Sequence, residues 1–252
     1  MDLQLEDLKA IVTGGSAGIG RSTATVLAEE GCHVGICARG EEGVRDAVAA
    51  LEGNGRTAFG RAVDVADRDA LEGWVEDSAA ALGGLDIVVA NVSSLGSGEG
   101  YEEWRRAFEV DLLHTVAVVD AALPYLRASD AAAIVIVSSV AAREPIDAGA
   151  YGAIKAALNR HGKGLAGRLA PEGIRVNVVS PGTIYMEDGF WGAVERKNPD
   201  MFRQALDANP MGRMGRPEEV ARSIAFLASP AASFIAGTNL LVDGALTRGV
   251  QM

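Results

Sequence analysis

Short, mostly apolar runs are spaced along the chain, and stretches with the apolar spacing of amphipathic helices separate most of them. Runs of this kind are typical of strands that are buried on both faces of a parallel sheet. Their alternation with helices predicts an α/β fold with a doubly wound, mainly parallel sheet. The predicted strands are Leu8–Val12, His33–Ala38, Thr57–Val63, Asp86–Ala90, Ala133–Val137, Arg175–Val179 and Asn239–Val242.

Apolar positions three and four residues apart predict the helices between these strands. The pattern is weaker from Pro181 to Gly215, where glycine, proline and several large apolar residues occur. The chain has 252 residues and shows no repeat, low-complexity tract or linker, so we predict a single domain over residues 1–252. The predicted helices are one that follows the loop 13–20 and ends near Glu30, then Glu41–Leu51, Asp67–Leu82, Tyr101–Leu126 with a candidate kink at Pro124, Ala150–Leu169 and Pro217–Leu227.

The charge and hydropathy of the chain argue against some classes of binding partner and against insertion into a membrane. Lys and Arg total 23 against 34 Asp and Glu, a net charge of −11 that argues against nucleic acid, anionic membranes and acidic carrier proteins unless a basic patch exists. Simple solubility also explains this charge. No apolar stretch has transmembrane length, and the acidic N-terminus is unlike a signal peptide.

The cysteines and histidines bear on disulfides, metal binding and the compartment. The two cysteines, Cys32 and Cys37, flank one strand at an odd offset, so they point to opposite faces and no bridge is expected. No Cys/His cluster has metal spacing, and we expect no metal. A cytoplasmic location fits best.

The stretch Tyr151-Gly-Ala-Ile-Lys155 carries candidate chemistry. On a helix, residues four apart share one face, so the ammonium of Lys155 is expected near the phenol of Tyr151. A nearby positive charge favours the ionised phenol and lowers its pKa from near ~10. A tyrosine tuned in this way can act as a general acid or base. This spacing also occurs in helices without any catalytic role.

A glycine-rich loop follows the first predicted strand and opens a helix. Its glycines allow tight turning and close approach to a phosphate, while the helix N-terminus adds N–H donors and partial positive charge. The order strand, loop, helix favours dinucleotide binding over an ordinary turn, although the spacing G-x-x-x-G-x-G differs from the commoner G-x-G-x-x-G. The candidate cofactor-binding residues here are Thr13, Gly14, Ser16, Gly18, Ile19 and Gly20.

The end of the second strand bears on cofactor choice. An acidic residue there would prefer NAD, whereas Ala38 leaves room and Arg39 supplies a cation for a 2′-phosphate. NADP(H) is therefore the preferred cofactor, with NAD(H) as the alternative. Ala17 stands where a second basic residue would strengthen this inference, and a solvated surface arginine is the competing explanation.

Polar or conformationally special residues also follow four other predicted strands. Because ligands of open parallel sheets bind at the carboxyl ends of strands, these residues are expected at one edge. They are Asp64 and Val65, Asn91, Ser138 and Ser139, and Pro181 and Gly182.

Together these motifs resemble the short-chain dehydrogenase/reductase family over nearly the full chain. The residues that carry the resemblance are Thr13-Gly14-x-x-x-Gly18-x-Gly20, Asp64-Val65, Asn91, Ser139 before Tyr151-x-x-x-Lys155, Pro181-Gly182, Pro217-Glu218-Glu219-Val220-Ala221 and Val242-Asp243-Gly244. The resemblance implies seven strands in the order 3-2-1-4-5-6-7. It also implies a homotetramer or homodimer with a subunit interface near the C-terminal strand.

The resemblance further implies roles for individual residues. Tyr151 exchanges the substrate proton, Ser139 orients the substrate oxygen, and Lys155 lowers the tyrosine pKa and binds the nicotinamide ribose. Asp64 and Val65 hold the adenine, and Asn91 lies along the cofactor. Pro181, Gly182, Thr183 and Ile184 complete the cofactor-binding set.

Three departures from the family pattern stand out. The family's catalytic asparagine matches Asp111, where a backbone role in a proton relay survives but a side-chain role changes. The usual Asn-Ala-Gly is replaced by Asn91-Val92-Ser93. Ser139 lies twelve residues before Tyr151, whereas Ser138 has the family's spacing of thirteen; Ser139 is preferred because it matches the second serine at the strand end.

The segment 183–214 is expected to cover the substrate, as in the family. Candidate pocket residues are Leu95, Tyr185, Met186, Phe190 and Trp191. Met186 replaces a frequent threonine, so Thr183 is a candidate for that hydrogen bond. Phe190 and Trp191 would equally serve to pack a lid or a subunit contact, and His114 is expected to be a core or interface residue.

Three functions are compatible with these features. The first is NADP(H)-dependent interconversion of a small, largely apolar ketone and a secondary alcohol. The second is reduction of a 3-oxoacyl group on a carrier protein, for which Arg127 and Arg168 offer little basic surface. The third is a cofactor sensor without turnover, which the Ser-Tyr-Lys set argues against.

Overall fold

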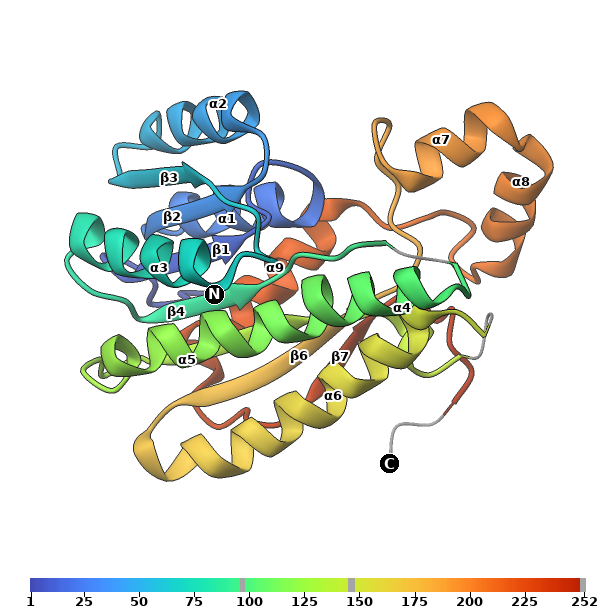
Figure 1. The fold of residues 1–252 in the computed structure, drawn as a ribbon. Coiled ribbons are helices and arrows are strands. Elements are labelled where there is room, and N and C mark those ends of the chain that lie inside the picture. Colours follow the sequence, from blue (N-terminus) through green and yellow to red (C-terminus); the bar gives the residue numbers. More distant parts are fainter. Residues whose placement is uncertain (96–97, 145–147, 250–252) are drawn as a thin grey trace.

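A sheet of parallel strands runs through the centre of the computed structural model, which describes residues 1–95, 98–144 and 148–249 (Figure 1). Within these residues seven strands pair in the order β3-β2-β1-β4-β5-β6-β7, as predicted, and every neighbouring pair is parallel. The strands are β1 (Lys9–Thr13), β2 (His33–Ala38), β3 (Ala58–Ala62), β4 (Ile87–Ala90), β5 (Ala133–Val137), β6 (Arg175–Pro181) and β7 (Asn239–Val242).

Helices connect the strands. Where a helix links two neighbouring parallel strands, it returns the chain to the same end of the sheet. The α-helices are α1 (Gly18–Glu29), α2 (Glu41–Glu52), α3 (Arg68–Leu82), α4 (Tyr101–Ala107), α5 (His114–Leu126), α6 (Ala150–Leu169), α7 (Phe190–Lys197), α8 (Pro199–Ala208) and α9 (Pro217–Ala228). Shorter or non-α turns are η1 (Phe108–Leu113), η2 (Val140–Ala142), η3 (Ala170–Glu172) and η4 (Pro230–Ala232).

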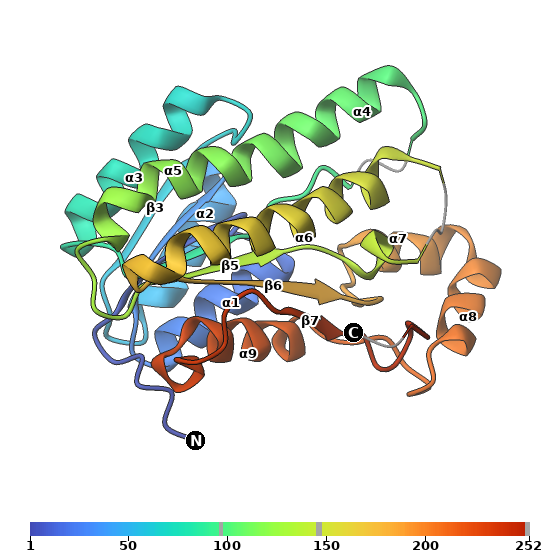
Figure 2. The same cartoon turned by 90° about the horizontal axis from the view of Figure 1, so that it is seen from below.

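Two hydrophobic cores hold the helices on the sheet, one on each face. The core on one face joins the sheet to α3, α5 and α6, and the core on the other face joins it to α1, α2 and α9. Figure 2 shows β5 and β6 between these two layers. All five residues of β5 are buried, which explains why the strand is a continuous apolar run.

Two predicted segments differ from the structure. The helix predicted over Tyr101–Leu126 contains a π-helical stretch, η1, and α5 continues through Pro124 to Leu126. The segment with the weak pattern forms α7 and α8, which stand beyond the ends of the strands (Figures 1 and 2). Backbone hydrogen bonds between Thr183, Tyr185 and Gly215 join the two ends of this segment to each other.

Candidate active site

A cleft of about 1800 Å³ lies along the carboxyl ends of the strands. Most of its lining comes from the loops after β1 to β6, so the sheet order places residues from distant parts of the chain together. Most predicted site residues line it, while Thr13, Gly20, Asp111 and Tyr185 do not. The predicted residues in the lining are Gly14, Ser16, Gly18, Ile19, Arg39, Asp64, Val65, Asn91, Leu95, Ser139, Tyr151, Lys155, Pro181, Gly182, Thr183, Ile184, Met186, Phe190 and Trp191.

The glycine-rich loop opens the cleft at the N-terminus of α1. Gly14 has a φ of +69°, and a Cβ there would lie 3.0 Å from Asn91 Nδ2. A Cβ on Gly20 would lie 2.2 Å from the Gly14 carbonyl oxygen, so Gly20 serves the packing of the loop and not the lining of the cleft. Ala17 caps α1 without a side-chain acceptor. The first N–H groups of α1 are therefore suited to bind a phosphate, and the loop fits a dinucleotide.

Thr13 supports the loop from inside the protein. Its hydroxyl oxygen accepts the Asn91 backbone N–H at 3.0 Å and lies 3.2 Å from His114 Nε2. The Asn91 side-chain amide in turn donates to the Thr13 carbonyl oxygen at 3.0 Å. The expectation that Thr13 touches the cofactor is therefore replaced by a supporting role, because its side chain is fully buried. His114 is buried as predicted.

The adenosine end of the cleft contains Arg39 beside the end of β2. Its side chain is exposed, and no ion pair is found for it among the described residues. Arg21, on the first turn of α1, also lines this cleft and was not predicted. Asp64 accepts the Ala66 N–H at 3.1 Å, which shapes the turn after β3.

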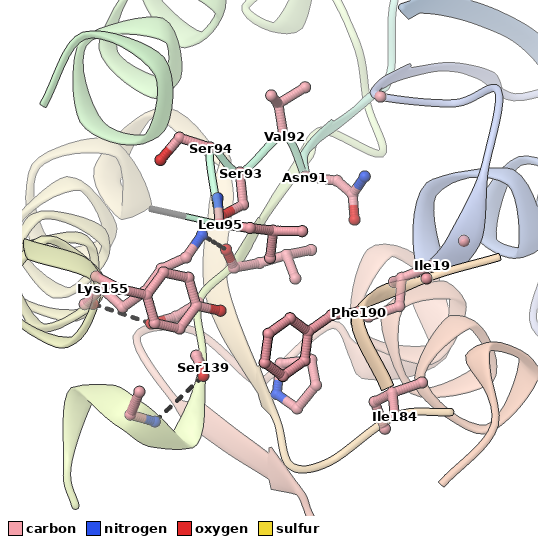
Figure 3. A pocket seen from close by; sticks show the side chains of 18 of the residues that line it. Ile19, Asn91, Val92, Ser93, Ser94, Leu95, Ser139, Lys155, Ile184 and Phe190 are labelled. Carbon is pink, nitrogen blue, oxygen red and sulfur yellow. Dashed lines mark hydrogen bonds between the residues drawn. The ribbon is translucent and has the colours of Figure 1, made fainter. Parts of the chain in front are cut away.

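Tyr151, Lys155 and the two serines meet on one wall of the cleft. Lys155 Nζ lies 5.6 Å from the centre of the Tyr151 ring, as the helical spacing predicts. The Ser138 hydroxyl donates to the Lys155 carbonyl oxygen at 2.9 Å. The Ser139 oxygen accepts the Ala141 N–H at 3.2 Å, which leaves its hydroxyl proton able to donate to a substrate oxygen. Figure 3 shows Ser139 and Lys155 across the pocket from Phe190.

Asp111 lies behind Lys155 and does not reach the cleft. Its Oδ1 is 3.0 Å from Lys155 Nζ, and both side chains are almost completely buried. Its Oδ2 accepts the Ser94 N–H at 2.8 Å, and its carbonyl oxygen accepts the Thr115 hydroxyl at 2.9 Å. Burial raises the pKa of Asp111, but Lys155 and hydrogen bonds from Ser94 and Ser93 outweigh it and hold the pKa below its usual value.

The segment after β6 forms the opposite wall. A Cβ on Gly18 would lie 2.7 Å from Met186 Sδ, so Met186 lies against the glycine-rich loop. Phe190 and Trp191 both line the cleft and contact each other edge to face, with ring centres 5.2 Å apart. Tyr185 is not a pocket residue: its hydroxyl donates to Glu195 at 2.6 Å and its ring contacts Phe202. It therefore holds α7 and α8 to the preceding loop.

Neither a metal centre nor a membrane-spanning helix is found in the part of the chain that the structure describes. Among the described residues, no group of three or more His, Cys, Asp or Glu side chains is placed to hold a metal ion. No helix within the described ranges is both long and apolar enough to cross a membrane.

Comparisons with known proteins agree with this geometry. Residues 14–247 match a family model described as Enoyl-(Acyl carrier protein) reductase. The chain is 39% identical over 252 residues to isoepoxydon dehydrogenase of Penicillium expansum. This match covers 98% of this chain and 97% of the relative. It is also 38% identical over 245 residues to cis-4-hydroxycyclohexanecarboxylate dehydrogenase of Sinomonas cyclohexanicum. That match covers 94% of this chain and 96% of the relative.

A solved structure shares the whole fold. L-sorbose reductase from Gluconobacter frateurii, complexed with NADPH and L-sorbose, superimposes with a TM-score of 0.91 at 29% identity. The match covers 99% of this chain and 100% of the reductase.

Proposed function

Because the chain belongs to the short-chain dehydrogenase/reductase family and is an NAD(P)-dependent oxidoreductase, we propose that it interconverts a small, largely apolar ketone and its secondary alcohol with NADP(H). The observation that carries this proposal is the meeting of Ser139, Tyr151 and Lys155 on one wall of a cleft that begins at a phosphate-binding loop. The similarity to a dehydrogenase of a hydroxycyclohexane acid supports a ring alcohol or ring ketone as the first substrate class to test.

Each residue has a distinct task in this proposal. The bound nicotinamide supplies the hydride for reduction and accepts it for oxidation. The Ser139 hydroxyl donates to the substrate oxygen and fixes its position between the two walls. Tyr151 gives its phenol proton to that oxygen during reduction and takes it back during oxidation. Lys155 holds a positive charge beside the phenol ring, and Phe190 and Trp191 exclude water from the apolar part of the substrate.

Substitution of Tyr151 tests the acid/base role. We expect Tyr151→Phe to lower turnover at least about 100-fold, because a positioned acid or base typically contributes that much or more. NADPH binding, measured by fluorescence, should change little. Tyr101→Phe is the matched control, since Tyr101 is 79% exposed and does not line the cleft.

The same assay separates the candidate functions. NADPH oxidation is measured with ring ketones, open-chain ketones and 3-oxoacyl thioesters. Turnover of the thioesters alone would favour the carrier-protein reductase, and tight NADPH binding without any turnover would favour the sensor. A Tyr151→Phe protein as fast as wild type would contradict the proposed chemistry.

The proposed preference for NADP(H) depends on Arg39. We expect Arg39→Ala to weaken NADPH binding about tenfold or more, the size of one lost charge-assisted hydrogen bond, and to leave NADH binding nearly unchanged. Arg45→Ala is the matched control, because Arg45 lies on α2 and does not line the cleft. Equal losses for both cofactors in Arg39→Ala would show that Arg39 does not read the 2′-phosphate.

We further propose a homotetramer, with a homodimer as the alternative, from the family resemblance. Light scattering would report a mass four or two times that of the chain. A cytoplasmic location is supported by Cys32 and Cys37, which are both free and buried.

A further inference from the structure

Two departures from the family pattern meet at one place in this protein. Ser93 stands where the family has glycine, and Asp111 stands where it has asparagine. The Ser94 N–H donates to Asp111 Oδ2 at 2.8 Å, and the hydroxyls of Ser93 and Ser94 help to lower the pKa of the carboxyl. Figure 3 shows both serines on the same side of the pocket as Lys155. The hydroxyl that Ser93 adds is thus placed where the extra negative charge of Asp111 needs a donor.

The other side of the carboxylate faces Lys155. The Nζ–Oδ1 separation is 3.0 Å, which is an ion pair, and within the described residues Oδ1 has no hydrogen-bond donor. A buried carboxylate without such a donor is costly unless an opposite charge compensates it. Lys155 supplies that charge, and its ammonium donates a hydrogen bond to the Val137 carbonyl oxygen at 3.3 Å.

We propose that Ser93, Ser94 and Asp111 form a buried counter-ion site that partly cancels the positive charge Lys155 presents to Tyr151. Asp111 is then a positioning residue that acts through Lys155, since it does not touch the cleft. This inference rests on the proposed acid/base function of Tyr151 for its catalytic meaning. The effect of Asp111 on the charge near Tyr151 can be measured without any turnover.

The sign of the effect follows from the order of charges. A positive charge near a phenol favours the phenolate, and a carboxylate on the far side of that charge opposes the effect. Asp111 therefore reduces the net positive charge that Lys155 presents to the Tyr151 phenol. The protonated phenol is the form that donates to the substrate oxygen during reduction.

Other charges near this wall are further away or more exposed. His114, at the start of α5, is buried and does not touch the phenol; its Nε2 faces Thr13. Next to η2 and on α4 and η1, the ionisable side chains that line the cleft are Arg143, Glu144, Arg106 and Glu109. Their greater contact with water weakens their effect on Tyr151 relative to the buried pair.

Ultraviolet titration of tyrosinate in the cofactor-free protein tests the proposal directly. The signal of Tyr151 is isolated by subtracting the same protein with Tyr151→Phe. We expect Asp111→Asn to move the midpoint of this signal to lower pH by about one unit. Glu109→Gln, which removes a partly exposed carboxylate from the same π-helical stretch, is the matched control and should move it much less.

Some outcomes would overturn the proposal. An unchanged midpoint in Asp111→Asn, or a midpoint at higher pH, would show that Asp111 does not oppose the charge of Lys155. The proposed function fails separately, through the absence of turnover on the substrate panel. A purely structural Asp111 would lower the melting temperature without moving the Tyr151 midpoint.

Ser93→Ala tests the site even where Asp111→Asn does not fold. Loss of the Ser93 hydroxyl should raise the pKa of Asp111, so the acid-induced unfolding of Ser93→Ala is expected to begin at higher pH than that of wild type. Ser223→Ala is the matched control, because that hydroxyl donates to the Glu219 backbone carbonyl and touches no carboxylate. Identical acid unfolding of wild type and Ser93→Ala would contradict the proposed role of Ser93.

Discussion

At the scale of single residues, the buried contact between His114 and Thr13 gives the protein a built-in sensitivity to acid. The imidazole is almost completely buried, and burial first and Lys155 second lower the pKa of His114 to about 4. In an unfolded chain a histidine titrates near ~6.5. Between these two pH values, His114 is mostly neutral in the folded protein and mostly protonated in the unfolded chain.

Replacement of His114 should remove part of this sensitivity. Between pH ~6.5 and ~4 the unfolded chain binds more protons, so the free energy of unfolding falls as the pH falls, by roughly 3 kcal/mol from this group. We expect His114→Gln to flatten the dependence of unfolding free energy on pH in that window, measured by urea unfolding at several pH values. His33→Gln is the control, because His33 is partly exposed near Asp7. Parallel pH profiles for wild type and His114→Gln would contradict the assignment.

Residue spacing predicted some parts of the site and missed others. The positions of Tyr151 and Lys155 followed from the period of a helix, and that of Arg39 from the end of a strand. The contact of Ser93 and Ser94 with Asp111 did not follow, because those serines are 17 or 18 residues from Asp111 and the fold sets their approach. The supporting role of Thr13 could not be predicted either, since its partners His114 and Asn91 are distant in the chain.

At the scale of elements, strands were easier to predict than the segments that cover the site. The central strands β4 and β5 are fully buried apolar runs, so their pattern is visible in the sequence. The edge strands β3 and β7 are only partly buried, and their pattern is weaker. The π-helical stretch Phe108–Leu113 interrupts a helix whose apolar spacing looked continuous, because the spacing cannot reveal a local change from i+4 to i+5 hydrogen bonds. Helix α8 buries no residue fully, although its apolar and polar residues lie on opposite faces, so burial in the core does not account for its pattern.

Gly192 in helix α7 offers a test of how the segment that forms the second wall of the cleft packs. A Cβ on Gly192 would lie 2.0 Å from the Glu187 carbonyl oxygen, so α7 packs against the turn before it. We expect Gly192→Ala to displace Phe190 and Trp191, to raise the KM for substrate, and to lower the melting temperature. Steady-state kinetics and thermal unfolding measure both effects.

A second glycine is the matched control for this substitution. Gly167 lies in helix α6, and a Cβ there meets no other atom within 4 Å. Gly167→Ala should stabilise the protein by about 0.4–1 kcal/mol through the unfolded state and leave KM unchanged. An unaltered KM in Gly192→Ala would show that α7 does not shape the substrate wall.

At the scale of the whole molecule, the order of strands determines where the site lies. The chain reverses its direction of growth between β1 and β4, and Gly14 and Asn91 follow those two strands. Helical layers on both faces leave the strand ends as the open edge of the sheet. The motifs therefore predicted the cleft well, while its cover and the charges behind its wall required the three-dimensional structure.

The cleft takes its lining from segments that extend from Gly14 to Leu246, so a molecule that fills it joins nearly the entire chain. A ligand that binds only folded protein at a hundred times its dissociation constant adds about 2.7 kcal/mol to the free energy of unfolding. Degradation in cells follows the population of opened molecules. We therefore expect the lifetime of this enzyme in a cell to follow the supply of its own coenzyme, so that starvation for the coenzyme would also deplete the enzyme.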